Sequence, residues 1–401
     1  MLEVSVCDRI RIYKNQGGEK QMKKVLGIFV LAFMVFGFAA CGGTETTENG
    51  GTTTEEEKEW NIVMITDVGT ITDKSFNQGT WEGVQAFAEA NDIPAMYFRP
   101  NEGTQAEYEA AIDLVVENGA NMIVTPGFLF ETAIYNKQTE YPDVRFILID
   151  GTPHTPDYST FHTADNTTNI LFKEEQAGFL AGYAAVADGF TDLGFMGGME
   201  VPAVQRFGIG YVAGAFYAAN ELDNTISFPA NRYTYLGDFD ASPAHITEAS
   251  GWYSSGTEII FAAAGGAGQS VMAAAEAATG ATVIGVDVDQ AADSETVISS
   301  AVKRLAVAVQ QELTAIIIDG EGNGGTTLVK GAQEDAVGLP LGDSFKWENF
   351  TEADYETIYA LIEDGTIVVP TTEDELDTFL EAHAGNPDVA ALVEETMTES
   401  E

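Results

Sequence analysis

From near Trp60 onward, short β-rich apolar runs alternate with longer helical patterns, an alternation that is typical of α/β folds. The alternation pauses in a connector at 152–166 and then starts again. In the first series the expected strands are 60–66, 95–98, 122–124 and 144–149, and the expected helices are 75–91, 105–118 and 131–140. In the second series the expected strands are 193–196, 232–236, 258–261 and 282–286, and the expected helices are 171–189, 202–222, 242–254 and 268–279. The pattern therefore predicts two successive parallel sheets.

Beyond Gln290 the pattern is less regular. We expect a strand at 296–299, a helix at 302–319, a glycine-rich turn at 320–325, a helix at 350–364 and a strand ending at 367–370. Residues 371–401 form an acidic C-terminal extension with modest helical periodicity, and the sequence assigns it no role.

Three aspartates occupy equivalent places in this pattern. Asp67, Asp150 and Asp287 each directly follow an expected strand. Ligands of open parallel sheets bind at the carboxyl ends of the strands, so two such edges facing each other would enclose a cleft. A single aspartate after a strand is as often a helix N-cap as a ligand contact. Three in the same relative place favour a binding cleft.

The N-terminal region has the layout of a secretory signal. Residues 22–41 combine two lysines, an apolar core and small residues before Cys41, an ending that resembles a bacterial lipobox. We therefore expect Cys41 to carry lipid, with an uncleaved signal anchor as the alternative. Residues 42–58 lack apolar side chains and are expected to be a flexible tether. Residues 1–21 do not fit this layout, so we interpret them as a non-native leader that precedes a true start at Met22.

Charge and motif content exclude several classes of function. The chain has 63 acidic and 18 basic residues and a net charge of −45, which argues against nucleic-acid binding. The excess charge is interpreted as a means of keeping the outer surface soluble. Its cysteines, Cys7 and Cys41, precede the expected globular part, which therefore has neither a disulfide framework nor a cysteine-based metal site.

No enzyme motif is present. The four histidines have no metal-ligand spacing, and no GxSxG, HExxH or P-loop pattern occurs. An alternative from a different class is a nucleoside hydrolase, which would need a cluster of aspartates around a metal. Asp287 and Asp289 would share one face of an extended segment, but two carboxylates are too few for such a site. No cofactor and no metal are expected.

Several segments together resemble a known family. The run at 67–78 (DVGTITDKSFNQ), with the lipobox-like ending, resembles the basic membrane protein family, lipoproteins similar to the purine-nucleoside receptors that serve ABC transporters. Further segments match in the same order along the chain, at 125–127, 149–151, 197–202, 206–211, 264–268 and 284–290. The resemblance extends from about Asn61 to Pro370 and implies a two-lobed periplasmic-binding-protein type I fold. Its lobes would be Rossmann-like and joined by hinge crossings, with 59–166 and 301–322 in the first lobe and 167–300 and 323–370 in the second.

The resemblance also implies a set of binding residues. Phe76 would stack on the base, with Asp67, Asn77 and Asp150 beside it at the same edge. In the second sheet Asp287 would accept hydrogen bonds from the ribose, and Lys303 would donate to it. The remaining implied contacts are Gly265 and Gly266, which let the backbone approach the ligand, and Phe207 as a second ring. Alternatives remain for three of these residues: Phe76 and Phe207 as core side chains and Lys303 as an ordinary helix lysine.

These expectations combine into one hypothesis. The chain would be an extracytoplasmic binding protein, anchored to the cell membrane by lipid on Cys41, that captures nucleosides, purine nucleosides foremost, for an ABC transporter permease. The alternative is a lipoprotein of the same fold that binds a sugar or another small molecule.

Overall fold

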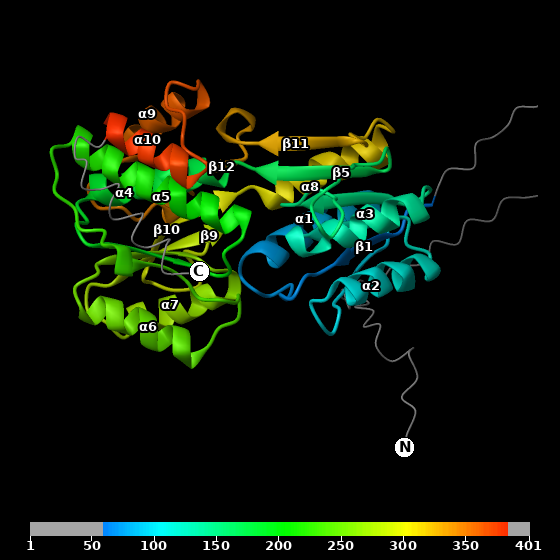
Figure 1. The fold of residues 1–401 in the computed structure, drawn as a ribbon, viewed down its shortest axis with the longest axis horizontal. Coiled ribbons are helices and arrows are strands. Elements are labelled where there is room, and N and C mark those ends of the chain that lie inside the picture. Colours follow the sequence, from blue (N-terminus) through cyan, green and yellow to red (C-terminus); the bar gives the residue numbers. More distant parts are fainter. Residues whose placement is uncertain (1–58, 384–401) are drawn as a thin grey trace, which may run out of the picture. The chain divides into compact units, whose positions relative to one another are not determined.

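Two six-stranded sheets, each flanked by helices, organise the computed structural model, which describes residues 59–383 (Figure 1). Both sheets lie within one structural unit that begins at Trp60. The strand order is β11-β5-β4-β3-β1-β2 in the first sheet and β12-β10-β9-β8-β6-β7 in the second. Neighbouring strands pair in parallel, except for the antiparallel pair of β10 and β12. The predicted α/β class with two parallel sheets is confirmed.

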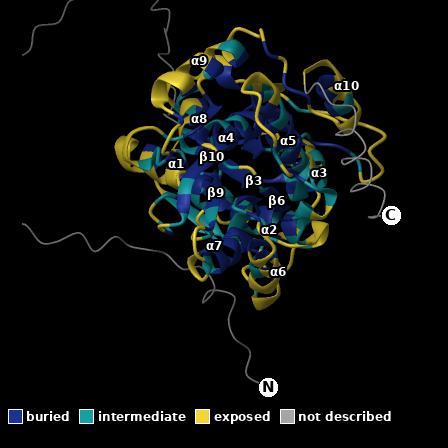
Figure 2. Ribbon diagram, turned by 90° about the vertical axis from the view of Figure 1, so that its left-hand side faces the viewer, coloured by how far each residue is buried: buried dark blue, intermediate teal, exposed yellow. Residues whose placement is uncertain are grey.

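The first lobe contains the first sheet and the helices that pack on it. Its strands are β1 (Ile62–Ile65), β2 (Ala95–Phe98), β3 (Met122–Pro126), β4 (Arg145–Ile149), β5 (Thr167–Phe172) and β11 (Thr326–Lys330). Its helices are α1 (Phe76–Asn91), α2 (Gln105–Glu117), α3 (Glu131–Glu140) and α8 (Leu305–Leu313), which lies along α1. The residues of β1 and β3 are buried throughout, because helices cover both faces of a parallel sheet (Figure 2).

The second lobe repeats this plan. Its strands are β6 (Leu193–Gly197), β7 (Tyr233–Tyr235), β8 (Ile259–Ala263), β9 (Thr282–Asp287), β10 (Val297–Lys303) and β12 (Val337–Gly338). Its helices are α4 (Glu174–Asp188), α5 (Pro202–Glu221), α6 (Pro243–Ser254), α7 (Gly268–Glu276), α9 (Glu352–Glu363) and α10 (Glu373–His383). Helices α4 and α5 approach closely enough that a Cβ on Gly178 would overlap the backbone oxygen of Phe207.

The backbone crosses between the lobes after β5, after β10 and after β11, and these crossings correct the expected lobe boundaries. Residues 167–172 and 326–330 were expected in the second lobe, yet they form β5 and β11 of the first sheet. Residues 301–303 were expected in the first lobe, yet they complete β10 of the second sheet. Only the second half of β5 is apolar, and it leads directly into α4. A short apolar run has no periodicity that separates a strand from a helix.

Two further segments differ from expectation. The expected helix at 302–319 begins only at Leu305, since β10 continues to Lys303, and it ends in a π-helical turn at Thr314–Ile318. The expected strand ending at 367–370 has no regular secondary structure. The described part of the acidic C-terminal extension forms α10, which packs on α5 and buries three apolar side chains, Leu376, Phe379 and Leu380.

The expectations for the N-terminal region lie outside the described residues. These are the leader at 1–21, the signal peptide at 22–41 with Cys41, and the tether at 42–58. Among the residues that are described, no helix is both long and apolar enough to cross a membrane.

Candidate functional site

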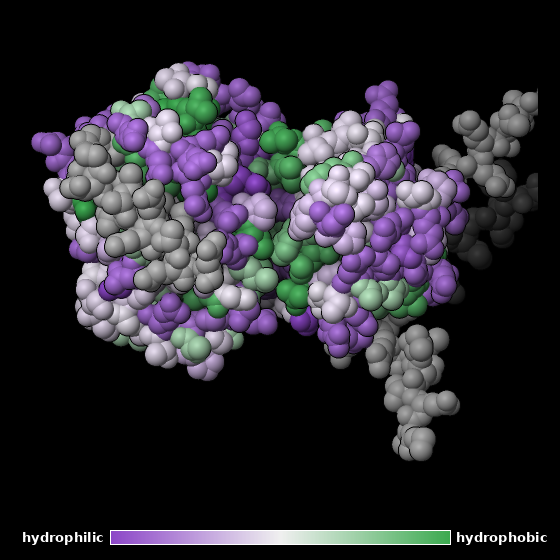
Figure 3. Space-filling model, in the orientation of Figure 1, coloured by the Kyte–Doolittle hydropathy of each residue, from purple (hydrophilic) through white to green (hydrophobic). Residues whose placement is uncertain are grey.

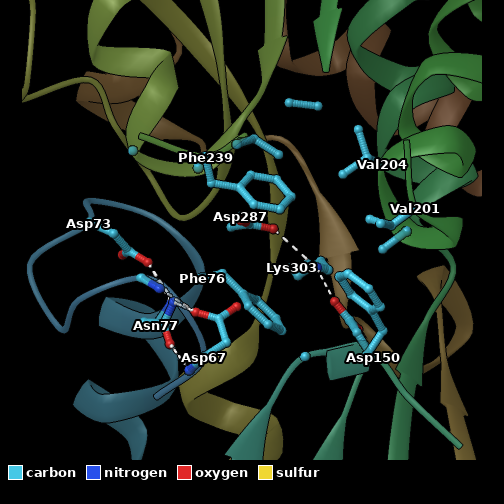
Figure 4. Close-up of a pocket in the computed structure, with 18 of the residues that line it drawn as sticks. Asp67, Asp73, Phe76, Asn77, Asp150, Val201, Val204, Phe239, Asp287 and Lys303 are labelled. Atoms are coloured by element: carbon cyan, nitrogen blue, oxygen red, sulfur yellow. Dashed lines mark hydrogen bonds and ion pairs between the residues drawn. The ribbon is translucent and has the colours of Figure 1, made fainter. Parts of the chain in front are cut away.

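A cavity opens where the carboxyl ends of the strands of the two lobes meet. Together with its open mouth and the solvent in it, it holds about 760 Å³ of empty space. All nine residues that the family resemblance implies as binding residues line this cavity: Asp67, Phe76, Asn77, Asp150, Phe207, Gly265, Gly266, Asp287 and Lys303. Figure 4 shows most of them converging from both lobes. The fold therefore brings the whole predicted set together, and ligand contact by each member stays a prediction.

Asp67 is held in place by the turn that follows β1. Its Oδ1 accepts hydrogen bonds from the backbone N–H of Gly69 at 2.7 Å and from Nδ2 of Asn77 at 2.9 Å. Nδ2 of Asn77 also donates to Oδ2 of Asp73 at 3.0 Å, so both of its hydrogens are used within the protein. Asn77 thus orients Asp67 and has no amide hydrogen left for a ligand. Burial raises the pKa of Asp67 to about 6, although the hydrogen bonds from Gly69 and Asn77 oppose this shift.

Asp73 was not predicted as a site residue, yet it lines the cavity and organises the start of α1. Its Oδ1 accepts from the backbone N–H of Ser75 at 2.9 Å, and its Oδ2 accepts from the backbone N–H of Asn77 at 2.9 Å. These bonds satisfy N–H groups that a helix start leaves free, and they fix the position of Phe76 between them. An aspartate shortly before a helical pattern is the signal that could have identified it.

Lys303 joins the two lobes. Its Nζ lies 2.5 Å from Oδ2 of Asp150, at the end of β4, and 3.1 Å from Oδ1 of Asp287, at the end of β9. Both aspartates have left-handed backbone conformations, with φ of 54° and 67°, which aspartate tolerates better than most residues. Burial alone lowers the pKa of Lys303, but the carboxylates of Asp150 and Asp287 outweigh it and hold the pKa above its ordinary value. Lys303 is therefore a buried, charged member of the site and not an ordinary helix lysine.

Aromatic rings surround this ammonium group. Nζ of Lys303 lies 4.5 Å from the ring centroid of Phe76 and 5.5 Å from that of Phe207, distances typical of cation–π contacts. The Phe207 ring is only 2% exposed and meets Phe261 edge-on at 5.7 Å. Phe207 therefore belongs to the core of the second lobe and also forms part of the cavity wall. The ring of Phe76 is less buried and faces the cavity (Figure 4).

Phe239 lines the cavity and was missed by the sequence analysis. It lies in the loop after β7, and a Cβ at Gly265 would come within 3.3 Å of its ring. At Gly266 a Cβ would lie 2.9 Å from the backbone oxygen of Phe239. The two glycines therefore make room for this aromatic loop. No motif surrounds Phe239 in the sequence, and only the fold brings it to the cavity.

The cavity wall combines these polar groups with apolar side chains. Val201 and Val204, at the start of α5, and Phe128, after β3, also line it and were not predicted. Asp289, considered in the hydrolase alternative, is not among the lining residues. Within residues 59–383 no group of three or more His, Cys, Asp or Glu side chains is arranged to hold a metal ion. The arrangement offers hydrogen bonds, a buried cation and aromatic faces to a small organic molecule.

Comparisons with known proteins agree with the family resemblance found in the sequence. A model of the Bmp family, described as ABC transporter substrate-binding protein PnrA-like, matches residues 61–372. The CD4+ T-cell-stimulating antigen of Listeria innocua is 29% identical over 368 residues, which cover 86% of this chain and 97% of the relative. The ABC transporter nucleoside-binding protein BmpA of Lactococcus lactis is 27% identical over 372 residues, which cover 87% of this chain and all of the relative.

Among solved structures, an ABC transporter solute-binding protein from Aeropyrum pernix matches with a TM-score of 0.69 at 24% identity. The match covers 82% of this chain and 99% of that protein. This similarity confirms the two-lobed binding-protein fold. The match to the Bmp family model confirms the family resemblance that the sequence motifs indicated.

Proposed function

Because the chain belongs to the Bmp family of PnrA-like ABC transporter substrate-binding proteins, we propose that it captures a nucleoside, and purine nucleosides foremost, in this cavity for delivery to a transporter permease. Membership of a substrate-binding family, and not of an enzyme class, agrees with the absence of enzyme motifs in the sequence. The observation that carries the proposal is that the cavity combines aromatic rings with carboxylates and a buried ammonium group, since a nucleoside has a flat base and a polar sugar.

The aromatic rings suit a base. Phe76 from the first lobe and Phe239 from the second lobe both contribute rings to the cavity (Figure 4), and valines of α5 add an apolar wall. Stacking on aromatic side chains is the general means of holding a base, because every base presents a π-face. Oδ2 of Asp67 lies at the edge of this region, since a Cβ at Gly127 would come within 4 Å of both this oxygen and the Phe76 ring. We propose that the base stacks on Phe76 with one edge toward Asp67.

The carboxylates and the ammonium group suit a ribose. Asp150, Asp287 and Lys303 present carboxylate acceptors and an ammonium donor, with Nζ of Lys303 within 3.1 Å of both carboxylates. Vicinal hydroxyls can donate to the carboxylates and accept from the ammonium group, as charge-assisted hydrogen bonds. Gly265 and Gly266 also line the cavity, beside Phe239.

The charge of the cavity favours a neutral ligand. Four aspartates and one lysine line it, so an added phosphate would meet an excess of negative charge. We therefore expect nucleosides to bind and nucleoside 5′-monophosphates to bind much more weakly. The alternative ligand, a free sugar, would use the carboxylates and Lys303 but has no base to stack on Phe76.

A titration series tests the proposal. Inosine, adenosine, cytidine, ribose and inosine 5′-monophosphate would each be titrated against ligand-free protein by calorimetry. Saturable binding of the purine nucleosides, with weaker binding of the monophosphate and of ribose, is the expected outcome. Binding of ribose as tight as that of inosine would favour the sugar alternative. Release of free base from inosine during incubation would favour the hydrolase alternative.

The proposed membrane anchor is tested separately. Its support is the lipobox-like sequence that ends at Cys41. Cys41→Ala should abolish incorporation of a radioactive fatty acid into the protein in the producing cells. Equal labelling of the wild type and the variant would refute lipidation at Cys41.

A further inference from the structure

Glu174 is a buried carboxylate outside the cavity lining. It is the first residue of α4, directly after the crossing from β5, and its side chain has no exposed surface. Its Oε2 accepts a hydrogen bond from Nε of Arg206 at 2.7 Å, whereas its Oε1 has no hydrogen-bond partner among the described residues. A buried carboxylate oxygen without a hydrogen-bond donor lowers the stability of the folded state, and such oxygens are rare in proteins.

The unpartnered oxygen lies behind Lys303. Oε1 of Glu174 is 3.8 Å from Nζ of Lys303, too far for a hydrogen bond but close enough for attraction. Lys303 thus has three carboxylates around it, and they divide by lobe. Asp150 belongs to the first lobe, whereas Asp287 and Glu174 belong to the second lobe with Lys303 itself. Any separation of the lobes must break the ion pair with Asp150 and leaves the other two carboxylates beside Lys303.

We propose that Glu174 is a positioning residue for Lys303, to which the ammonium group turns when the lobes separate and Asp150 moves away. Glu174 thereby stabilises the open arrangement of the lobes and sets how much free energy a ligand must spend in closing them. The part of this inference that concerns ligands rests on the proposed function. The part that concerns the lobes does not.

The electrostatics of Glu174 agree with an exchange of partners, in which Lys303 leaves Asp150 and pairs with Glu174 when the lobes separate. Burial, opposed by Arg206, raises the pKa of Glu174, and the Asp150 carboxylate raises it further. In this structure, with Lys303 paired to Asp150, the charged form of Glu174 is therefore disfavoured. Moving Asp150 away and Lys303 nearer would relieve this penalty, so the charged form is better stabilised when the lobes are open.

If Lys303 exchanges Asp150 for Glu174, replacing Glu174 should strengthen ligand binding, whereas loss of a residue that only supports the fold should weaken it. Glu174→Gln keeps the size of the side chain and an oxygen for Arg206 but removes the charge that attracts Lys303. The open arrangement then loses its acceptor, and the ligand-free protein shifts toward the closed arrangement. Because apparent affinity is reduced by the fraction of protein in the wrong state, the variant should bind its ligand more tightly. Simple damage to the fold would weaken binding instead.

The neighbouring residue supplies a matched control. Glu175 is also buried on α4, its Oε2 also has no hydrogen-bond partner among the described residues, and this oxygen lies 3.9 Å from Nε of Arg206. In the described part of the chain its ion pair is with Arg206 and not with Lys303. Glu175→Gln therefore removes a second buried carboxylate that pairs with Arg206 but has no ion pair with Lys303 among the described residues.

The lobe arrangement can be measured directly with spin labels. Glu102 and Asp240 are exposed and follow β2 and β7, the edge strands farthest in each sheet from the crossings, so their separation reports opening. The labels would be attached to cysteines at these two positions of the full chain, with Cys7 and Cys41 replaced by serine. Pulsed electron–electron double resonance on ligand-free protein then gives the populations of short and long distances between the two labels.

We expect Glu174→Gln to raise the ratio of short to long distances by about fivefold or more, the lower end of typical coupling effects. Glu175→Gln should match the wild type. An unchanged or smaller ratio in Glu174→Gln would overturn the proposal. Should this variant fail to fold, Glu174→Asp keeps the charge but withdraws it by one methylene, and a shift in the same direction is required of it.

A titration with inosine adds a second readout. Glu174→Gln should bind inosine about fivefold more tightly than the wild type, with correspondingly slower dissociation. Weaker binding by a folded variant would contradict the proposal. If the wild type does not bind inosine, the proposed function fails, and the distance measurement still decides the role of Glu174.

Discussion

At the scale of single residues, the site combines groups that the sequence reveals with groups that only the fold reveals. Phe76, Asp67 and Asn77 stand within one family-like run, so the resemblance could assign them together. Phe239 stands in an acidic loop without a motif, and Glu174 reaches Lys303 only because the crossing after β5 brings α4 to the end of β10. Sequence patterns describe neighbours along the chain, and such contacts between distant segments leave no local signal.

The two phenylalanines of the predicted set should respond differently to truncation. Phe76→Ala should weaken inosine binding by about 1–3 kcal/mol, the loss expected for one stacked base, with little effect on folding. Phe207 is buried against Phe261, so Phe207→Ala should instead lower the free energy of unfolding by about 3–5 kcal/mol. Calorimetric titration and urea denaturation of both variants measure these effects. Unchanged inosine affinity in folded Phe76→Ala would make Phe76 a core residue.

At the scale of elements, the alternation of strands and helices predicted most of both sheets because amphipathic helices and short apolar runs have different periods. It failed at β5, whose buried residues lead without a break into α4, and at β11, whose exposed residues have little apolar pattern. The close approach of α4 and α5 was also not predicted, although glycines on both helices make it possible. These glycines bring the carboxylates of α4 next to Arg206 on α5.

Replacing one of these glycines tests the helix contact. A Cβ at Gly210 would overlap the backbone oxygen of Glu175, so Gly210→Ala should force the helices apart and lower the free energy of unfolding by about 1–3 kcal/mol, as overpacking does. A Cβ at Gly251, within α6, would meet no atom within 4 Å, and Gly251→Ala should raise stability by up to about 1 kcal/mol. Thermal unfolding of the two variants gives the comparison. Equal effects in both would refute the packing argument.

At the scale of the whole molecule, the acidic surface and the buried carboxylates both lower the stability of the fold as the pH rises. The face in Figure 3 is mainly hydrophilic, as expected for a chain with a net charge of −45. Burial raises the pKa of Asp67 from its ordinary 3.8 to about 6 and that of Glu175 from 4.5 to about 7. Between these values the native state holds protons that the unfolded state has released, so stability must fall as the pH rises.

We therefore expect the free energy of unfolding to decrease from about pH 4.5 to about pH 7, with part of the decrease due to Glu175. Urea denaturation across this range measures it. Glu175→Gln should flatten the dependence, because glutamine does not titrate. A stability that rises with pH over this range would contradict the assignment of raised carboxyl pKa values.

A binding cycle with two ligands and two proteins decides whether a nucleoside lies in the cavity with its ribose against Asp287. Inosine and 2′-deoxyinosine would each be titrated into the wild type and into Asp287→Ala. In the wild type, loss of the 2′-hydroxyl should cost about 1–3 kcal/mol, because a buried carboxylate oxygen loses a donor. In the variant this penalty should shrink, since the acceptor is already absent. Equal penalties in the two proteins, or no binding of inosine by the wild type, would contradict the account.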